Sequence, residues 1–244
     1  MTGKNRPYII CHMLSSIDGR ISGDFFRLSE LQPARSAFGR IRSEFDCDGI
    51  LYGAVTAAEV CADGYIEMPD HVQKKTPRKD FMAETQLNRF VIATDPEGKL
   101  CWSRNYVERP GLPKSHVIEI LTEKAGDAYL AYLQGLGISY IIAGTEQLDC
   151  RTAAEKLGEA FGIRKILLAG GGAINWSFLQ EGLIDELSLV TAPLTDGRRD
   201  TAAVFDRSPY CSENIPAAFS LLDVQKLDED TLWLRYRPKN IRGK

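Results

Sequence analysis

The sequence predicts an α/β fold with a mostly parallel sheet that ends in an antiparallel hairpin. Short apolar runs, typical of buried strands, alternate with amphipathic helical segments from the start of the chain to residue 192. Two further β-type runs flank the acidic turn at residues 228–230 and predict the terminal hairpin. Neither a break in composition nor an internal repeat divides the sequence, so we expect one domain over residues 1–244.

The individual elements follow from the apolar runs and from helical periodicity. Strands are expected at residues 8–14, 48–52, 89–94, 116–121, 138–143, 164–169, 183–192, 219–224 and 232–236. Helices are expected at residues 33–46, from 57 onward, from a cap at Asp127 to Gly137, at 153–161 and from 173 to 182. The polar residues 62–87 predict a long surface excursion.

Composition excludes several classes of protein. The net charge is −3, which gives no basic footprint for nucleic acid. No apolar run in the sequence reaches the ~18 residues of a membrane span, and the first run, at residues 8–14, is too short for a signal peptide. The six cysteines form no C-x-x-C pair, and no His/Cys spacing suits a metal. We therefore expect a cytoplasmic protein with reduced thiols that binds neither nucleic acid, nor a membrane, nor a metal.

Three consecutive glycines, Gly170, Gly171 and Gly172, separate a predicted strand from a predicted helix. Glycine lets the backbone approach a ligand closely, and the first turn of a helix presents unpaired N–H groups and a partial positive charge. This layout favours a phosphate site. A tight turn without a ligand is the alternative, although three glycines exceed what a turn needs.

Polar or glycine-rich segments follow three of the predicted strands, at residues 15–19, 53–56 and 170–172. Ligands of open α/β sheets bind outside the carboxyl ends of the strands, and parallel strands bring these ends to one edge. A ligand with two separated phosphate groups, such as a dinucleotide, would use both of the segments that open helices. A standard Rossmann site fits badly, because Asn175 replaces the third glycine of the fingerprint and no acidic residue ends the next strand.

Single residues near these segments allow two interpretations each. Asp18 is either a functional carboxylate or the first residue of an Asp-Gly turn. Thr56 either binds a phosphate oxygen or caps its helix. His12 is either a substrate contact or a satisfied core histidine. Strand alternation places His12 on one face with Leu14 and Ser16, which directs it toward the loop after the strand.

Three segments together resemble a known family. Residues 8–20 contain the core S-I-D-G-R, residues 48–56 carry a strand, a glycine and a threonine, and residues 169–193 carry the glycine triplet and a closing Ala-Pro. In this order and spacing they resemble the C-terminal reductase domain of the riboflavin-biosynthesis deaminase/reductases, the RibD C-terminal family. The resemblance implies one reductase domain with a dihydrofolate-reductase-like, three-layer α/β/α fold. It also implies NADPH as cofactor, a small-molecule substrate, and a homodimer formed through the sheet edge or neighbouring helices.

The reaction that the resemblance implies reduces a ribosylamino-pyrimidine phosphate to its ribitylamino form, with hydride passing from the nicotinamide to C1′ of the opened sugar. Ser15 would contact the nicotinamide, the residues around Thr56 the adenosine phosphate, and Asp18 would close over cofactor and substrate. The implied cofactor-binding residues are Leu14, Ser15, Gly19, Gly53, Val55, Thr56, Gly170, Gly171, Gly172, Ala173, Ile174 and Asn175. The implied substrate-binding residues are Ser16, Arg42 and Ala169, and the implied catalytic residues are Asp18 and His12.

Two positions depart from the family pattern. His12 stands where the family commonly has a lysine, and Ala169 stands where it has an acidic residue. Loss of a hydrogen-bond acceptor for the substrate argues for a changed substrate or a changed role. Two alternatives therefore stay open: a dihydrofolate or pteridine reductase with a changed pocket, and a non-catalytic NADPH-binding sensor. Arg42 is equally consistent with a surface charge. The H-x-E and P-C-x-x-C motifs of a zinc deaminase domain are missing from the sequence.

Overall fold

The computed structural model describes residues 6–69, 76–208, 211, 214–228 and 230–239. The chain divides into two compact parts. The first part comprises Met1–Pro7 and Asp48–Arg164, and the second part comprises Tyr8–Cys47 and Lys165–Lys244. The expectation of a single domain stays a prediction. Among the described residues, no helix combines the length and the apolar character that crossing a membrane requires.

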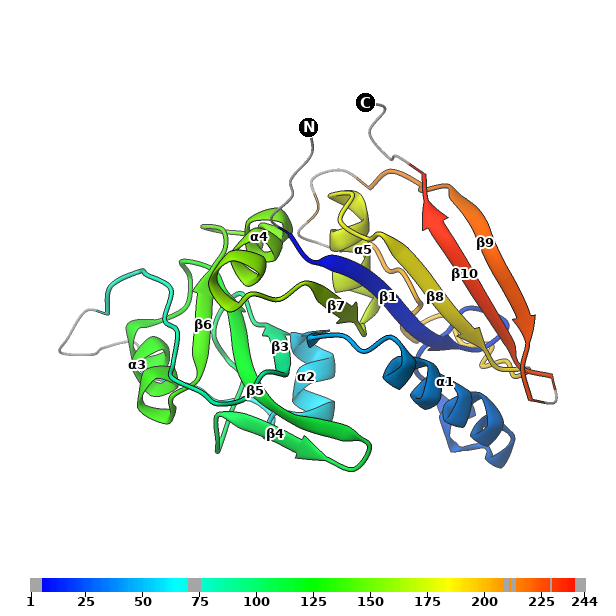
Figure 1. The fold of residues 1–244 in the computed structure, drawn as a ribbon, viewed down its shortest axis with the longest axis horizontal. Coiled ribbons are helices and arrows are strands. Elements are labelled where there is room, and N and C mark those ends of the chain that lie inside the picture. Colours follow the sequence, from blue (N-terminus) through cyan, green and yellow to red (C-terminus); the bar gives the residue numbers. More distant parts are fainter. Residues whose placement is uncertain (1–5, 70–75, 209–210, 212–213, 229, 240–244) are drawn as a thin grey trace. The chain divides into compact units, whose positions relative to one another are not determined.

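The first part contains a mixed sheet of mainly parallel strands (Figure 1). In that sheet β2 (Gly49–Gly53), β3 (Phe90–Thr94) and β5 (Leu112–Leu121) pair in parallel in this order. β4 (Tyr106–Arg109) pairs antiparallel with the first half of β5, and β6 (Ser139–Ile142) pairs in parallel with the second half. β4 and β6 therefore share the edge of β5 that β3 leaves free.

Helices cover both faces of this first sheet. They are α2 (Ala54–Val60), α3 (Asp127–Leu136) and α4 (Cys150–Phe161). Glu119 of β5 contacts Tyr129 of α3, and Phe90 of β3 packs on Phe161 of α4. The register partner of Phe90 is His116, three positions before Glu119 on β5. Because successive side chains of a strand point to opposite faces, α3 and α4 lie on opposite sides of the sheet.

In the second part the strands are hydrogen-bonded in the order β7-β1-β8-β10-β9, and we call this portion of the sheet the second sheet. β1 (Tyr8–Ser15) pairs in parallel with β7 (Lys165–Leu168) on one side and with β8 (Glu186–Thr191) on the other. The C-terminal strands β9 (Phe219–Lys226) and β10 (Leu232–Pro238) form an antiparallel hairpin, and β10 joins it to β8. The predicted closing hairpin is confirmed.

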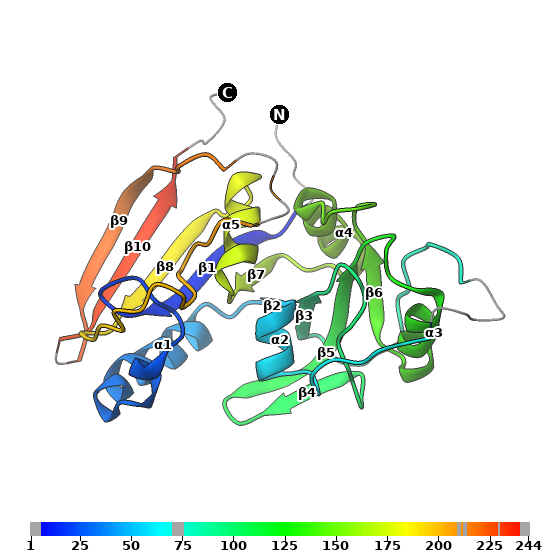
Figure 2. The ribbon, with the colours of Figure 1, turned by 180° about the vertical axis from the view of Figure 1, so that it is seen from behind.

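Two helices cover the opposite faces of this second sheet. They are α1 (Gln32–Glu44) and α5 (Gly172–Gln180). His12 of β1 stacks on Phe38 of α1, with ring centroids 4.3 Å apart. The next residue, Met13, points to the other face, where its methyl group lies 3.1 Å from the position of a Cβ atom at Gly170. Figure 2 shows α5 in front of β1 on that face. The predicted three-layer α/β/α class is thus confirmed.

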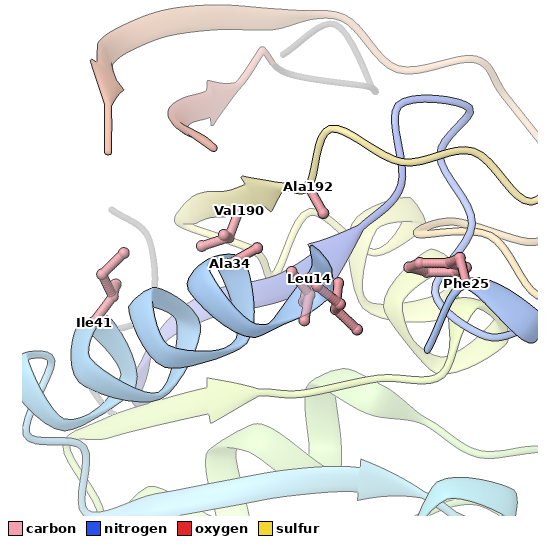
Figure 3. Close-up of a cluster of buried hydrophobic side chains, with 7 residues drawn as sticks. Leu14, Phe25, Ala34, Ile41, Val190 and Ala192 are labelled. Atoms are coloured by element: carbon pink, nitrogen blue, oxygen red, sulfur yellow. The ribbon is translucent and has the colours of Figure 1, made fainter. Parts of the chain in front are cut away.

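The apolar side chains between α1 and the second sheet form a core cluster (Figure 3). Its buried members are Leu14, Phe25, Leu31, Ala34, Ile41, Val190 and Ala192. Each fully buried leucine, isoleucine or phenylalanine side chain stabilises the fold by roughly 1.5–3 kcal/mol. The cluster fixes α1 against the carboxyl ends of β1 and β8, where the predicted site residues begin.

Three details of the fold differ from the sequence-based expectation. β4 was not expected, because its pattern is four residues long and only Val107 is buried. Asp127 does not cap α3; Gly126 precedes the helix, and the Asp127 carboxylate instead accepts hydrogen bonds from the Thr76 amide and the Arg78 guanidinium. Thr56 does not cap α2, because Gly53 holds that position and Thr56 is the third helical residue.

Candidate active site

The loop after β1 is a tight turn held by its own side chains. The Ser16 hydroxyl donates to Asp18 Oδ1 at 2.5 Å and accepts from the Arg20 amide at 3.0 Å. Gly19, with a φ of 79°, donates its amide to the Ser16 carbonyl. The left-handed conformation explains the glycine. Ser16 and Asp18 are brought together as predicted, but they use their polar atoms within the turn.

Asp18 also binds a second segment of chain. Its carboxylate accepts hydrogen bonds from the amides of Asp196 at 3.2 Å and Gly197 at 2.8 Å. The Ser16 hydroxyl and these amides stabilise the carboxylate and lower the pKa of Asp18 to about 2. Asp18 is therefore ionised at neutral pH and has no proton to donate as an acid, while its predicted catalytic role stays a prediction.

Residues 194–206, which we call the strap, connect this turn with the glycine triplet. At one end the Ile17 amide donates to the Leu194 carbonyl at 2.8 Å. At the other end the Asn175 side-chain amide donates to the Val204 carbonyl at 2.8 Å, and the Asp206 amide donates to the Gly172 carbonyl at 3.1 Å. The strap thus touches two of the three predicted ligand-binding segments.

The glycine triplet has a structural role in the packing of α5 against the strap, independent of any ligand. A Cβ atom at Gly172 would collide with the Ala203 carbonyl oxygen and the Asp206 carboxylate of the strap. Gly170 has a φ of 96°, a left-handed value that favours glycine. The glycines therefore have structural reasons that the sequence did not show, and a phosphate site has to be argued from the helix that follows.

The N-terminus of α5 can accept an anion. The helix has nine residues, and no described side chain caps its first turn. The first N–H groups of an α-helix lack partners within the helix and carry partial positive charge. Ala173 is exposed, so these groups are accessible on its side, whereas Ile174 and Asn175 are buried and face the protein. Any contribution of Ile174 and Asn175 to phosphate binding is therefore through their backbone.

His12 does not point toward the loop after β1, as strand alternation had suggested. It is fully buried against α1, and its ring also meets Phe45 edge-on. Nε2 is 3.0 Å from the Phe38 carbonyl, and Nδ1 is 2.9 Å from the Ser188 hydroxyl. Because a carbonyl only accepts, Nε2 carries the proton and Nδ1 accepts from Ser188. This arrangement is the satisfied core histidine that was the alternative interpretation.

Burial and the nearby Arg42 guanidinium lower the pKa of His12 to about 4, so its ring is neutral at physiological pH. The Ser188 hydroxyl also accepts from Trp233 Nε1 at 2.8 Å, which links β10 through β8 to His12. Arg42 is half-buried, and its Nε atom has no hydrogen-bond partner among the described residues. The buried Nε–H of Arg42 is therefore a donor without an acceptor in the described part of the chain.

The remaining predicted residues occupy different positions. Leu14 is a core residue, and its predicted cofactor contact stays a prediction. Ser15 is buried at the end of β1, and Ala169 is half-buried after β7. In the first part, Gly53 precedes α2, Val55 is exposed and Thr56 is half-buried. The roles of Gly53, Val55 and Thr56 stay predictions.

Comparison with known proteins gives a consistent result. The RibD C-terminal domain model matches residues 7–233. The 2,5-diamino-6-ribosylamino-4(3H)-pyrimidinone 5′-phosphate reductase of Methanothermobacter thermautotrophicus is 36% identical over 204 residues, which cover 82% of this chain and 84% of that protein. The chain belongs to the RibD C-terminal domain family. A reductase of the same name from Aquifex aeolicus is 29% identical and covers 98% of this chain and 93% of its own length.

Solved structures related to the RibD C-terminal domain family share the fold. A pyrimidine reductase-like protein of Corynebacterium diphtheriae matches with a TM-score of 0.66 and 17% identity, over 97% of this chain and 93% of that one. RibD of Acinetobacter baumannii matches with a TM-score of 0.60 and 21% identity over 97% of this chain, which spans 59% of the RibD chain. The family resemblance inferred from the sequence is confirmed.

Membership in the RibD C-terminal domain family implies a reductase with a nicotinamide cofactor. The residues of the second part fit the phosphates of such a cofactor, because the uncapped first turn of α5 offers N–H donors beside the exposed Ala173. The Asp206 carboxylate lies beside Gly172 and disfavours an anion there, so the Ala173 side is the one that suits a phosphate.

Sequence reasoning missed the strap within this member of the RibD C-terminal domain family. Asp196 through its carboxylate and Asp206 through its main-chain amide bind it to the rest of the second part, and neither was singled out. One signal was available: residues 18–20 and residues 196–198 both read D-G-R, so two Asp-Gly turns occur in the sequence. The structure places these two turns in direct contact through Asp18.

Proposed function

We propose that the protein is an NADPH-dependent reductase of a ribosylamino-pyrimidine 5′-phosphate, with 2,5-diamino-6-ribosylamino-4(3H)-pyrimidinone 5′-phosphate as the first substrate to test. The observation that carries this proposal is the 36% identity to the reductase of that name over 82% of the chain. Bound NADPH supplies the hydride that reduces C1′ of the opened sugar. The neutral, buried His12 and the ionised Asp18 support positioning roles for both residues.

The chain's own residues would bind and orient the two ligands. We assign the cofactor phosphates to the backbone of the first turn of α5 on the side of Ala173, because that turn is uncapped and Ala173 is exposed. We assign the substrate phosphate to Arg42, whose Nε is buried without a partner in the described part of the chain. The α1 face that carries Arg42 is fixed by the hydrogen bond from His12 to the Phe38 carbonyl.

A charge placed at the first turn of α5 tests the cofactor assignment. Ala173→Asp is expected to raise the Kd for NADPH by about tenfold or more, because a carboxylate would then face the phosphates. The fold should keep its stability, since an acidic side chain suits a helix N-terminus. Ala173→Asn, which has the same shape without the charge, is the matched control. NADPH fluorescence titration measures the affinity, and equal affinities for the two variants would remove α5 from the cofactor site.

Turnover decides between the proposed activity and simple binding. Purified protein is mixed with NADPH and the pyrimidinone phosphate, and the loss of NADPH absorbance is followed alongside a dihydrofolate control. Oxidation that depends on the pyrimidinone phosphate supports the proposal. Tight NADPH binding without oxidation by any substrate would contradict the proposed reduction.

We also propose that the protein forms a homodimer through the edge strand β9. β9 ends the second sheet and exposes large apolar side chains, with Leu221 at 56%, Leu222 at 40% and Val224 at 52% exposure. Exposed apolar edge strands are sites of strand pairing. Val224→Lys is expected to halve the mass measured by light scattering during gel filtration. The comparison variant is Ser36→Lys on the exposed side of α1, and dissociation by that variant alone would place the interface on the helix.

A further inference from the structure

The two Asp-Gly turns of the second part hold each other by a reciprocal pair of contacts. The Asp18 carboxylate accepts from the main-chain amides of Asp196 and Gly197. The Asp196 carboxylate in turn accepts from the main-chain amide of Asp24 at 3.0 Å, in the segment that follows Asp18. Each aspartate therefore binds the backbone of the segment to which the other belongs. We call these contacts the aspartate clasp.

Asp196 is built into the structure although its loop is at the surface. Its side chain is 2% exposed. Besides the amide in the clasp, the carboxylate accepts from Arg198 Nε at 3.1 Å and from the Thr201 hydroxyl at 3.2 Å. Gly23 has a φ of 131°, and a Cβ atom there would collide with the Asp196 carboxylate. A carboxylate with these partners keeps one position, so the turn at residue 196 is rigid.

The clasp is continuous with the start of α5. Beyond Thr201 the strap pairs with the segment after the first turn, through an antiparallel bridge between Arg20 and Ala203. The Val204 amide then donates to the Gly19 carbonyl at 3.2 Å, and the Val204 carbonyl accepts from Asn175 of α5. A shift of the strap would therefore move the loop after β1 and the first turn of α5 together.

We infer that Asp18 and Asp196 are positioning residues of the reductase: through the aspartate clasp they hold the strap and so fix the loop after β1 against the first turn of α5. The effect of the clasp on catalysis rests on the proposed function, whereas its hydrogen bonds do not. It gives the predicted catalytic residue Asp18 a positioning role, because both oxygens of its carboxylate already accept hydrogen bonds from the chain. Neither aspartate transfers a proton to the substrate.

Amide exchange measures the clasp without any ligand. In Asp196→Asn the main-chain amide of Asp24, which donates to the Asp196 side chain, is expected to exchange about tenfold faster with solvent, as for the loss of about one hydrogen bond. The matched control is Asp200→Asn, the same change at an exposed position of the strap. Unchanged exchange in Asp196→Asn, or equal acceleration in the control, would overturn the clasp.

Kinetics separate positioning from proton transfer. Asp18→Asn and Asp196→Asn are each expected to raise the KM for NADPH by about tenfold, with kcat changed less than about twofold and the pH profile of kcat unchanged. The double variant should be no worse than either single variant, because either change alone opens the clasp. A fall in kcat with an altered pH profile in Asp18→Asn alone would instead make Asp18 a proton-transfer group.

The two experiments fail in different ways. If the unmodified protein does not bind NADPH, the proposed function is wrong, and the exchange rates still show whether the clasp holds the strap. If NADPH binds and is oxidised but the two aspartate variants keep the original KM, the proposed function stands and the positioning role is overturned. Additive losses in the double variant would likewise show that the two aspartates act independently.

Discussion

Replacing Glu119 with alanine is expected to lower the free energy of unfolding by about 3 kcal/mol, whereas Glu119→Gln should change it by about 1 kcal/mol or less at pH 7. Glu119 is fully buried on β5, and its Oε1 accepts from Trp102 Nε1 at 2.5 Å. Alanine leaves this donor and a cavity behind, while glutamine keeps the shape and an acceptor.

The small effect expected for glutamine follows from counting protons around Tyr129. Its hydroxyl oxygen lies 2.8 Å from the Leu100 carbonyl, 3.2 Å from Asp95 Oδ2 and 2.9 Å from Glu119 Oε1. A tyrosine hydroxyl has one proton and cannot donate to all three oxygens. A protonated Glu119 that donates to Tyr129 removes one of the three competing acceptors and leaves the Tyr129 proton to the Leu100 carbonyl at 2.8 Å and the more distant Asp95 Oδ2. Asp95, which accepts from the Lys99 and Leu100 amides, is the member suited to the negative charge.

The pH dependence provides the measurement. Burial, followed by the neighbouring Asp95 charge, raises the pKa of Glu119 well above its usual 4.5. A carboxyl group with a higher pKa in the folded state adds stability that is complete below the unfolded value and is lost as the pH rises through the folded one. Thermal unfolding should therefore occur at lower temperature toward alkaline pH in the unmodified protein, and the slope should be smaller in Glu119→Gln.

A matched substitution at an exposed glutamate is the control for this interpretation. Glu123→Gln changes an exposed glutamate two residues after β5 and should leave the slope as it was. Burial also raises the pKa of Asp95, which is present in all of these proteins, so the difference between the slopes reports Glu119. Identical slopes for the unmodified protein and Glu119→Gln would mean that Glu119 is ionised in the fold.

Gly172→Ala is the second substitution with a large expected effect, a loss of about 2 kcal/mol or more of unfolding free energy. The added Cβ atom would overlap the Ala203 carbonyl oxygen and the Asp206 carboxylate. The carbonyl belongs to the backbone of the strap, so relief requires the strap to move away from α5. Chemical denaturation followed by circular dichroism measures the loss.

Gly39→Ala serves as the control for this substitution. Gly39 lies within α1, and a Cβ atom there has no atom of the described residues within 4 Å apart from its chain neighbours and its own helix backbone. Alanine at this position should raise stability by about 0.5–1 kcal/mol, because glycine is a poor helix former. A Gly172→Ala protein as stable as Gly39→Ala would show that the strap does not press on the glycine turn.

The sequence predicted the elements that have a strong local pattern and missed what depends on distant contacts. The apolar run of β1 and the glycine after α3 identified their elements, because burial and a left-handed helix end, with a φ of 68° at Gly137, leave local signatures. The family motifs marked the loop after β1 and the start of α5. The sequence could not predict that Gly172 packs against the strap. The atoms that exclude a side chain there belong to Ala203 and Asp206, some thirty residues away along the chain.

His12 shows why alternation alone misjudges a site. The strand pattern correctly placed it on one face with Leu14. Which helix covers that face, and how far along the strand it reaches, depends on tertiary packing. Phe38 of α1 stacks on the imidazole of His12, so the histidine ring lies in the core. The aspartate clasp of Asp18 and Asp196 could not be predicted for the same reason, because each aspartate alone has the pattern of an ordinary turn residue.

The pairing of β1 also constrains the order in which the molecule can be completed during synthesis. Both neighbours of this first strand, β7 and β8, begin only at Lys165 and Glu186. β1 must therefore leave the ribosome before either partner strand has been made. The whole continuous segment Asp48–Arg164 is translated before β7 follows. Its apolar residues lack their native sheet partners for that interval.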